Sequence, residues 1–586
     1  MNKIGLLILS FFVCLKCFAM TGCSRIDIRS QEDWNHLEQE IQRRLQNGKH
    51  KITVSIQVDS LFINDRILTL SGINDSSLSL RIEGNGVIVL PPRKTSLLDI
   101  SLNDVYLDEK QEIINNRSDV RIINSKIEPV EKYGSFLIAK SGYAIVPSGS
   151  VLEDCLKRFN VYRFPIELPD LSESECNDFY ILLTRQWAHY RHKVRFVKNG
   201  YLYFNFISEE APSNMQKYYL DPNADSQYGV HTRYSLINCP IDCQKPKFVC
   251  YSSPFIKIND SAIKELSITG FNFPYWTNTS PIIIKNCSFS DECVVHHNRF
   301  ANLTGIAISI SGSKNVIVSN NTISNTRMHA INIEGKSIVV KENSLNHIGW
   351  MGQTFAIRAS GEDIWIKDNT ITGFNYSAIG IGGNITKESR PQIFTVENNI
   401  IQFSESYAQN YKYHTLCDAG AIYANPQIDQ GIIRNNVILN YCGNAAYRGI
   451  FIDDGGRNMQ ISGNYISLYP NQEKQSYDID LRYCKTYESY IPDHNRNNKI
   501  FENLISGFYR FEGIDAEDNC FLGENYLLDD KFIDRNVFSV SNRKEDLHCG
   551  GKKTHNGVLY IPSKYKKDLR KKLGRKSLIF KYVKFH

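Results

Sequence analysis

The second half of the chain alternates short strand-like runs with a recurring triplet that begins with Asn and ends with an aliphatic or aromatic residue. In the preceding runs, apolar and polar residues alternate and β-branched residues are frequent, the pattern of a half-buried strand. The Asn residues that open the triplets are Asn298, Asn321, Asn343, Asn369, Asn399, Asn436, Asn464, Asn503 and Asn525. The shortest spacing is 22 residues, as from Asn321 to Asn343, and other spacings are longer. A fixed minimum with a variable excess indicates a repeated structural rung joined by loops of free length.

A strand-rich repeat of this length predicts an all-β fold, a right-handed parallel β-helix. In such a solenoid each rung buries Ile and Val against the next rung. The Asn side chain at the turn can hydrogen-bond to its neighbours above and below, which forms a ladder. The outer surface of a solenoid also offers a groove in which a long polymer can lie.

The N-terminal part of the mature chain predicts a short helix before the first strands. Trp34, Leu37 and Ile41 have helical spacing, with Ser30 as the expected cap and Asn47-Gly48 as the expected end. An open solenoid end exposes core and strand edges, so this helix is expected to cover the first rung. The cap and the first coils are assigned to residues 23–127.

The next segment, residues 128–250, breaks the repeat with several prolines and a hairpin signal at Asn199-Gly200. It predicts a small β-rich insertion. The rungs resume in residues 251–530, which form the parallel β-helix core with the candidate active site. Residues 531–586 form a basic C-terminal segment.

Residues 1–22 predict an export signal, because Lys3 precedes an apolar run from Ile4 to Leu15 that is too short to span a membrane. Met20-Thr21-Gly22-Cys23 resembles a bacterial lipobox. Two alternatives stay open, simple export and a lipid anchor at Cys23, and this anchor is the only membrane contact expected. The expected location is the periplasm, the cell surface or the medium.

Composition changes this picture only slightly. A hydrophobic content of 42% supports a packed core, and the net charge is +6. The basic tail favours either an acidic polymer or, more ordinarily, a solvated helix face. No nucleic-acid-binding signature accompanies it, so nucleic acid is not expected, and the chain is expected to be a monomer. In an exported chain, neighbours such as Cys287 and Cys293 suggest either disulfides or buried free thiols.

Two consecutive rungs carry unusual acidic residues, in Cys417-Asp418-Ala419-Gly420-Ala421-Ile422-Tyr423 and in Arg448-Gly449-Ile450-Phe451-Ile452-Asp453-Asp454-Gly455. When Gly420 is aligned with Gly449, Asp418 and Asp453 lie towards opposite ends of neighbouring strands. On straight strands that offset is roughly 20 Å. The carboxylates therefore converge only if the strand bends or the register differs from this alignment.

If the carboxylates converge, the arrangement is what a glycosidase needs. One carboxyl stays neutral and donates a proton, and the other is ionised and acts as nucleophile or base. Two ordinary alternatives remain: Asp-Asp-Gly is common in turns, and acidic pairs can hold Ca²⁺. The catalytic candidates are Asp418, Asp453 and Asp454. No metal ligand and no cofactor is assigned, with Ca²⁺ as the open alternative.

The motifs Asp-Ala-Gly-Ala-Ile-Tyr and Gly-Ile-Phe-Ile-Asp-Asp-Gly, with Asn-Asn-Val-Ile between them, resemble those of bacterial right-handed parallel β-helix glycoside hydrolases. These are secreted polysaccharide-degrading enzymes of Bacteroidetes, including glycoside hydrolase families 141 and 120. An interrupting β-rich module is also similar to theirs, and the resemblance covers most of residues 50–530. It implies hydrolysis by acidic residues, carried over here to Asp418 and to Asp453 or Asp454.

Polar residues near these rungs are candidates for binding a polysaccharide or oligosaccharide substrate. They are His414, Arg448, Arg358, Asp480, Arg482 and Glu334. Each alone is more often an ordinary surface residue. The leading hypothesis is a glycoside hydrolase acting on a complex polysaccharide. One alternative is a polysaccharide lyase on an acidic glycan, with His414, Arg448 or Arg482 near a uronate. The other is a glycan-binding protein without catalysis, since a fold does not fix a function.

Overall fold

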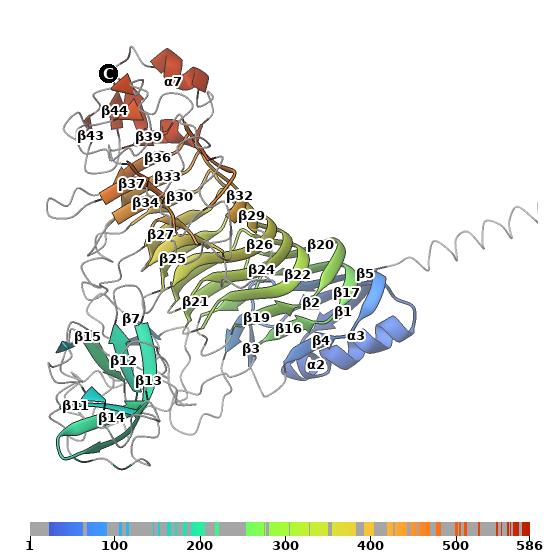
Figure 1. Cartoon of the computed structure of the whole chain (residues 1–586). Coiled ribbons are helices and arrows are strands. Elements are labelled where there is room, and N and C mark those ends of the chain that lie inside the picture. The colour runs from blue at the N-terminus through green and yellow to red at the C-terminus, as the bar shows by residue number, and fades with distance from the viewer. Residues whose placement is uncertain are drawn as a thin grey trace, which may run out of the picture.

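The structure is a computed structural model. It describes residues 23–62, 67–90, most of 254–382, much of 392–511, and shorter stretches between 105 and 221 and between 526 and 585. Its main body is a stack of parallel strands in two sheets, one of 20 strands (sheet A) and one of 13 strands (sheet B). Figure 1 shows the rungs stacked from the blue N-terminal end to the orange and red C-terminal end. The predicted parallel β-helix is confirmed.

Each rung crosses sheet A in two limbs and then enters sheet B. The central rungs of sheet A contain β20 (Ser288–His296), β22 (Ile308–Ser319), β24 (Ile331–Lys341), β26 (Phe355–Lys367), β28 (Ser377–Ile381), β29 (Gln392–Glu397), β31 (Ile422–Ala424), β32 (Ile428–Arg434), β34 (Tyr447–Ile452), β35 (Met459–Ser462) and β37 (Ser476–Leu481). The long strands β22, β24 and β26 run through both limbs and bend between them. At the bend of β26, a Cβ on Gly361 would lie within 1.9 Å of the Gly335 carbonyl oxygen, so this close stacking requires glycine.

The Asn triplets form the corner between sheet A and sheet B. The strands that follow them are β21 (Arg299–Leu303), β23 (Thr322–Thr326), β25 (Ser344–Ile348), β27 (Thr370–Phe374), β30 (Ile400–Gln402), β33 (Val437–Tyr441), β36 (Tyr465–Leu468) and β39 (Leu504–Ile505). Asn321 Nδ2 donates to Asn343 Oδ1 at 3.0 Å, and Asn343 Nδ2 donates to Asn369 Oδ1 at 3.0 Å. The same contact continues as far as Asn503, where Asn464 Nδ2 donates at 2.9 Å. The ladder is therefore confirmed from Asn298 to Asn503, and Asn525 lies outside the described residues.

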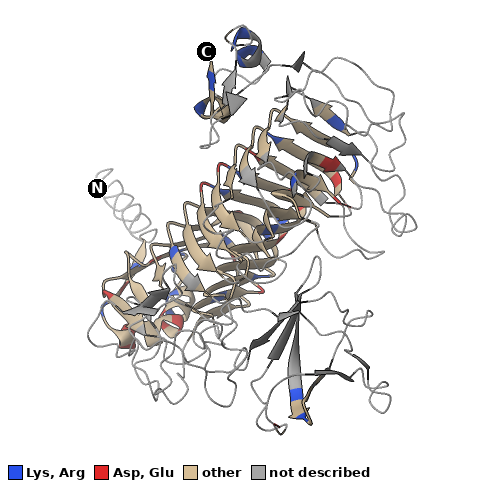
Figure 2. Ribbon diagram, turned by 90° about the vertical axis from the view of Figure 1, so that its left-hand side faces the viewer, with Lys and Arg blue, Asp and Glu red and all other residues tan. Residues whose placement is uncertain are grey.

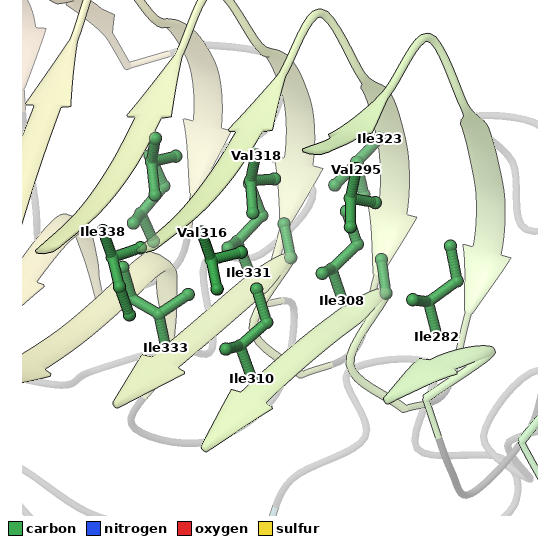
Figure 3. Close-up of a cluster of buried hydrophobic side chains, with 14 of the residues drawn as sticks. Ile282, Val295, Ile308, Ile310, Val316, Val318, Ile323, Ile331, Ile333 and Ile338 are labelled. Atoms are coloured by element: carbon green, nitrogen blue, oxygen red, sulfur yellow. The ribbon is translucent and has the colours of Figure 1, made fainter. Parts of the chain in front are cut away.

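A stack of isoleucines at matching positions holds the first limb together. The pairing joins Ile256, Ile282, Ile308, Ile331, Ile357, Ile379, Ile422, Ile450 and Ile479 in register. Figure 3 shows several of these side chains pointing into the solenoid, together with valines of the second limb such as Val316 and Val318. Burying this aliphatic surface is the main favourable term for stacking the rungs.

The N-terminal end of the stack carries the predicted helical cap, as two helices rather than one. These are α2 (Gln31–Asn35) and α3 (Leu37–Gln46). The Ser30 hydroxyl accepts from the Asp33 N–H at 3.1 Å, the expected capping bond. Trp34 stacks on Phe255 with ring centres 4.4 Å apart. The cap is thus anchored in the main core.

The predicted insertion interrupts the chain but not the stack. Strand β4 (Leu68–Ser71) pairs directly with β16 (Ile256–Asn259), and β5 (Asn74–Glu83) pairs with β17 (Ala262–Thr269). The last described rung strand before the interruption is β6 (Ile88–Leu90), earlier than the boundary at residue 128 drawn from the sequence. Two strands within residues 91–127, β7 (Val105–Leu107) and β8 (Ile113–Asn115), pair antiparallel with each other, unlike rung strands.

Seven antiparallel strands between residues 144 and 221 form a separate sheet. Its central hairpin joins β13 (His189–Lys198) to β14 (Tyr201–Asn205). Asn199 and Gly200 both have positive φ, 53° and 74°, as a tight hairpin turn requires. The hairpin predicted at this dipeptide is confirmed.

The C-terminal segment packs against the outer surface of sheet B. It contains α7 (Lys566–Lys572), the 3-10 helix η7 (Leu578–Lys581) and β45 (Val583–Phe585). Ile579 and Val583 join a second apolar cluster with Val437, Tyr465 and Leu504 of sheet B. The basic residues Lys566 and Arg570 of α7 are exposed, as the solvated-helix alternative expects.

The cysteines in the described rungs of the solenoid are free thiols. Cys287 and Cys293 are free and buried in the core, so a disulfide there is wrong and the buried-thiol alternative holds for this pair. Cys23 is free and exposed. In the described part of the chain, no helix has the length and apolar character needed to cross a membrane.

Candidate active site

The acidic rungs pair in a register one residue away from the glycine alignment. Ile422 of β31 lies opposite Ile450 of β34, and the Ala421 N–H donates to the Arg448 carbonyl oxygen at 3.0 Å. Gly420 therefore lies beside Arg448, and Asp453 lies beside Asn425. The glycine alignment, which set Asp453 opposite Ala424, is wrong by one position because similar letters do not fix the register of a strand.

The outward residues of the first limb form three rows along the solenoid, which we call the polar face. The middle row contains Asn332, Arg358, Gly380, Tyr423, Phe451 and Asp480. The row at the strand entrance, three positions before the middle row, contains His329, Phe355, Ser377, Gly420 and Arg448. It faces the same side, because the Phe355 ring lies against Gly380 and the Arg448 guanidinium lies over the Phe451 ring. The row at the strand exit contains Glu334, Ser360, Gly382, Asn425 and Asp453. In Figure 2 most described solenoid strands are uncharged, and charged positions are scattered among them.

Asp453 has a buried carboxylate held by a neighbouring rung. It is 8% exposed, and the Tyr423 hydroxyl donates to its Oδ2 at 2.8 Å. The Asn425 amide in turn donates to the Tyr423 hydroxyl oxygen at 2.7 Å. Because a donor that also accepts a hydrogen bond becomes a stronger donor, these two linked hydrogen bonds hold the Asp453 carboxylate in one orientation.

Tyr423 itself remains a phenol at neutral pH. Burial raises its pKa well above the usual value, and the neighbouring Tyr376 and the Asp453 carboxylate raise it further. The phenol keeps its proton and donates it to Asp453 Oδ2, while its oxygen accepts from the Asn425 amide. Tyr423 therefore orients the Asp453 carboxylate and itself stays neutral.

Arg448 and Asp480 form an ion pair beside the same rung. Arg448 Nε donates to Asp480 Oδ2 at 2.5 Å, and their side chains are only 2% and 0% exposed. The Arg448 guanidinium also lies 4.0 Å from the centre of the Phe451 ring. Both residues were predicted to bind substrate; the structure gives each the other as a partner, and substrate contact stays a prediction. The pair joins the entrance row of β34 to the middle row of β37, on the same face as Asp453.

Aromatic rings fill the polar face upstream of Asp453. The rings of Phe355 and Tyr423 have centres 6.0 Å apart, and those of Tyr423 and Phe451 are 5.4 Å apart. Gly380 makes room for this packing, since a Cβ there would lie 2.3 Å from a carbon of the Phe355 ring. Phe355 and Phe451 pack against the Tyr423 ring from the two neighbouring directions along the solenoid, which restricts the positions that its hydroxyl can take.

His329 lies at the upstream end of the polar face. The Phe355 N–H donates to its Nδ1 at 3.0 Å, so the proton of the neutral ring sits on Nε2. Burial, and after it the nearby positive charge of Arg358, lower the pKa of His329 to about 4. Arg358 is half-buried and Glu334 is exposed. Arg358 is three strands from β34, which corresponds to about 14 Å along the solenoid.

The structure describes only part of the predicted site. Asp453, Arg448, Asp480, Arg358 and Glu334 all lie on the polar face. The other predicted residues lie outside the described residues, and their convergence with Asp453 stays a prediction; they are Asp418, Asp454, His414 and Arg482.

Sequence reasoning missed Tyr423 and Asn425 as members of the site. They alternate with the core residues Ile422 and Ala424, and this period of two was the available signal. Only the correct register brings them beside Asp453. Among the described residues, no group of three His, Cys, Asp or Glu side chains forms a metal site.

Proteins similar to this chain are found among solved structures. No family model matches the chain, and no curated protein sequence matches it. A solved structure described as "Glycoside hydrolase" is 10% identical over 86% of this chain and 96% of its own, with a TM-score of 0.37. A complex of XylC with xylose is 10% identical over 88% of this chain and 85% of its own, with a TM-score of 0.27.

A third similar structure is the Gp54 tailspike of Acinetobacter baumannii bacteriophage AP22, in complex with A. baumannii capsular saccharide. It is 8% identical over 84% of this chain and 74% of its own, with a TM-score of 0.24. At these identities and scores, the likenesses assign no activity to this chain.

Proposed function

We propose that this chain is a carbohydrate-active enzyme, a glycoside hydrolase that cleaves a complex polysaccharide on the polar face of the solenoid. The observation that carries the proposal is the Asp453 carboxylate, 8% exposed and held at 2.8 Å by the Tyr423 hydroxyl. A buried carboxylate held in one orientation is costly for folding and useful for catalysis. The resemblance of the two acidic motifs to β-helix glycoside hydrolases supports the same reaction.

In this proposal Asp453 is the ionised carboxylate. Hydrogen bonds to the charged form favour it, so Asp453 is suited to act as base or nucleophile rather than as proton donor. The glycosidic C–O bond breaks, and the leaving oxygen takes a proton from a second, neutral carboxyl. Asp418 and Asp454 are the candidates for that proton donor. Either water bonds to C1 and gives its proton to Asp453, or Asp453 attacks C1 and water later releases the sugar.

The proposed substrate is a polymer that lies along the rows of the polar face. Arg358 and Glu334 lie on the upstream part of this face and are proposed to contact sugar residues away from the cleavage point. Such a substrate fits the predicted export signal of residues 1–22 and a monomer in the periplasm, on the cell surface or in the medium. A lipid anchor at Cys23 is the alternative to simple export, and a bound Ca²⁺ ion is the alternative to a site without metal.

The decisive experiment is product analysis of Asp453→Asn on a panel of polysaccharides. The variant keeps the shape of the side chain and can still accept from Tyr423, so it is expected to fold. Its kcat should fall by about 1,000-fold, within the usual contribution of a positioned acid or base. Asp429→Asn is the matched control, because Asp429 forms an ion pair with Arg457 on the second limb of neighbouring rungs. Unchanged hydrolysis by Asp453→Asn would refute the assignment.

The same panel separates the alternatives. Products with a new absorbing double bond would indicate a lyase instead of a hydrolase. Arg448 is a poor candidate for the base of such an elimination because it is paired with Asp480. Polymers that bind to the wild-type chain and stay uncut would indicate a glycan-binding protein.

A further inference from the structure

Two adjacent histidines converge on the second limb, on a different surface from the polar face. His296 is the last residue of β20, and His297 follows it with a left-handed backbone, φ 53°. Their Nδ1 atoms lie 2.6 Å apart, and their ring planes are inclined by 74°. Two imidazole nitrogens at this distance must share a proton or an ion, since two lone pairs would repel each other.

Ser267 supports one of the two rings from behind. Its hydroxyl oxygen lies 3.2 Å from His296 Nε2. When Nε2 carries the ring proton and donates to Ser267, the lone pair of His296 sits on Nδ1 and faces His297. A histidine that ligates a metal ion commonly donates its other N–H in this way, which fixes the tautomer and the ring orientation.

The turn that presents the pair is rigid and open to solvent. The next residue is Asn298, whose Oδ1 accepts from the Phe271 N–H at 3.0 Å and whose Nδ2 donates to Asn321. His296 is half-buried and His297 is exposed. The ladder therefore fixes the backbone next to the pair, and the imidazoles can still be reached by an ion from solution.

The surroundings do not oppose a cation strongly. The positive charge of Arg81 acts on His296, and Arg81 forms an ion pair with Glu83 at 2.6 Å that offsets it. Thr269 and Ser319, directly beside His296 on the two neighbouring strands, are short and uncharged. Short neighbours leave room for water molecules around a bound ion.

We propose that His296 and His297 form a binding site for a borderline divalent transition-metal ion such as Cu²⁺ or Zn²⁺. Both rings bind through Nδ1, and water fills the other positions, because no third His, Cys, Asp or Glu side chain joins the pair in the part of the chain that the structure describes. Metal–nitrogen bonds of about 2.0–2.1 Å require the two Nδ1 atoms to separate to about 3 Å. The exposed ring of His297 can make that small movement, and its proton moves from Nδ1 to Nε2 through water.

The next rung of the solenoid supplies a natural control for this site. Ser319 and Asn320 stand where His296 and His297 stand in their rung, and Asn320 also has a left-handed backbone, φ 54°. His296→Ser and His297→Asn therefore copy a sequence that this fold already accepts. Neither substitution should prevent folding, and neither touches the polar face.

The test is a Cu²⁺ titration of the full chain followed by electron paramagnetic resonance, with Zn²⁺ calorimetry in parallel. Imidazole favours both ions, and Cu²⁺ binds most tightly of the divalent series. The wild type should bind one equivalent with two nitrogen couplings, and both substitutions should abolish that equivalent. Ser267→Ala should weaken it about tenfold, as loss of an outer-shell partner does. His36→Ala, which removes an exposed histidine of the cap, should change nothing. Unaltered Cu²⁺ stoichiometry, affinity and spectrum in both His296→Ser and His297→Asn would overturn the proposal.

Discussion

The ladder corner and the polar face belong to the same rungs but use sequence in opposite ways. At the corner, each rung repeats one residue, and every described ladder Asn is almost fully buried. On the middle row of the polar face, the residue at the equivalent position differs from rung to rung. It is Arg358, Gly380, Tyr423, Phe451 and Asp480 in successive rungs. Repetition satisfies a structural demand that is the same at every rung. Variation of the outward residues, together with buried polar groups, indicates a functional site rather than a purely structural position.

The largest expected effect on stability comes from breaking the buried ion pair of the polar face. Arg448→Ala leaves the Asp480 carboxylate in a buried site without its cation and should lower the free energy of unfolding by roughly 3 to 5 kcal/mol. Urea unfolding of the purified variant measures this. The double substitution Arg448→Met with Asp480→Leu should recover most of the loss, since it removes both charges. A single variant as stable as the wild type would contradict the buried pair.

A smaller loss of unfolding free energy is expected when the Asn ladder at the corner is broken. Asn399→Ala removes donors to the Ile366 carbonyl and to Asn436, and it removes the acceptor of the Asn369 N–H. Leaving these buried groups unpaired should cost about 3 kcal/mol.

The neighbouring residue gives the control for the corner. Asn398 has φ 56° and is only half-buried, so Asn398→Gly keeps the turn and should change the unfolding free energy little. If both variants unfold at the same urea concentration as the wild type, the ladder contributes no stability. If only Asn399→Ala is destabilised, the effect belongs to the ladder and not to the turn.

The repeated region was also the part of the molecule that the sequence could predict. The Asn spacing and the alternating runs predicted the parallel stack, and Ser30 and Asn199-Gly200 predicted a cap and a hairpin that the structure contains. These features are local, and each is set by a few neighbouring residues. The site was predicted less well because it depends on register. The true register differs by one residue from the glycine alignment. Asp453 therefore lies opposite Asn425 instead of Ala424, and Tyr423 lies on the same face as Asp453.

The upstream end of the polar face should give the fold a specific pH dependence. The pKa of His329 is about 4 in the folded chain, below the ordinary value of 6.5. Between these values the unfolded chain binds the proton and the folded chain does not, so stability falls as the pH falls. From pH 7 to pH 5 this group should remove about 2 kcal/mol from the free energy of unfolding.

His329→Asn is the variant that isolates this dependence. The Asn side-chain oxygen can replace Nδ1 as acceptor of the Phe355 N–H but does not titrate. Urea unfolding at pH 7 and pH 5 should show a smaller loss for His329→Asn than for the wild type, while other titrating groups cancel in the difference. An identical loss in both proteins would mean that His329 takes up its proton in the folded state.

The smallest expected effect tests whether variation on the polar face serves catalysis. Tyr423→Phe keeps the ring packed against Phe355 and Phe451 but removes the hydrogen bond to Asp453. If Asp453 acts as an ionised base or nucleophile, kcat should fall about tenfold, as expected for loss of one hydrogen bond to a charged group. The acidic limb of the rate profile should also move to higher pH, because the charged form loses a donor. Tyr465→Phe removes a phenol from sheet B of the same solenoid and should leave the profile in place. A purely structural Tyr423 would lower stability and leave the pH profile unchanged, which would separate the Tyr423 hydrogen bond from the catalytic role proposed for Asp453.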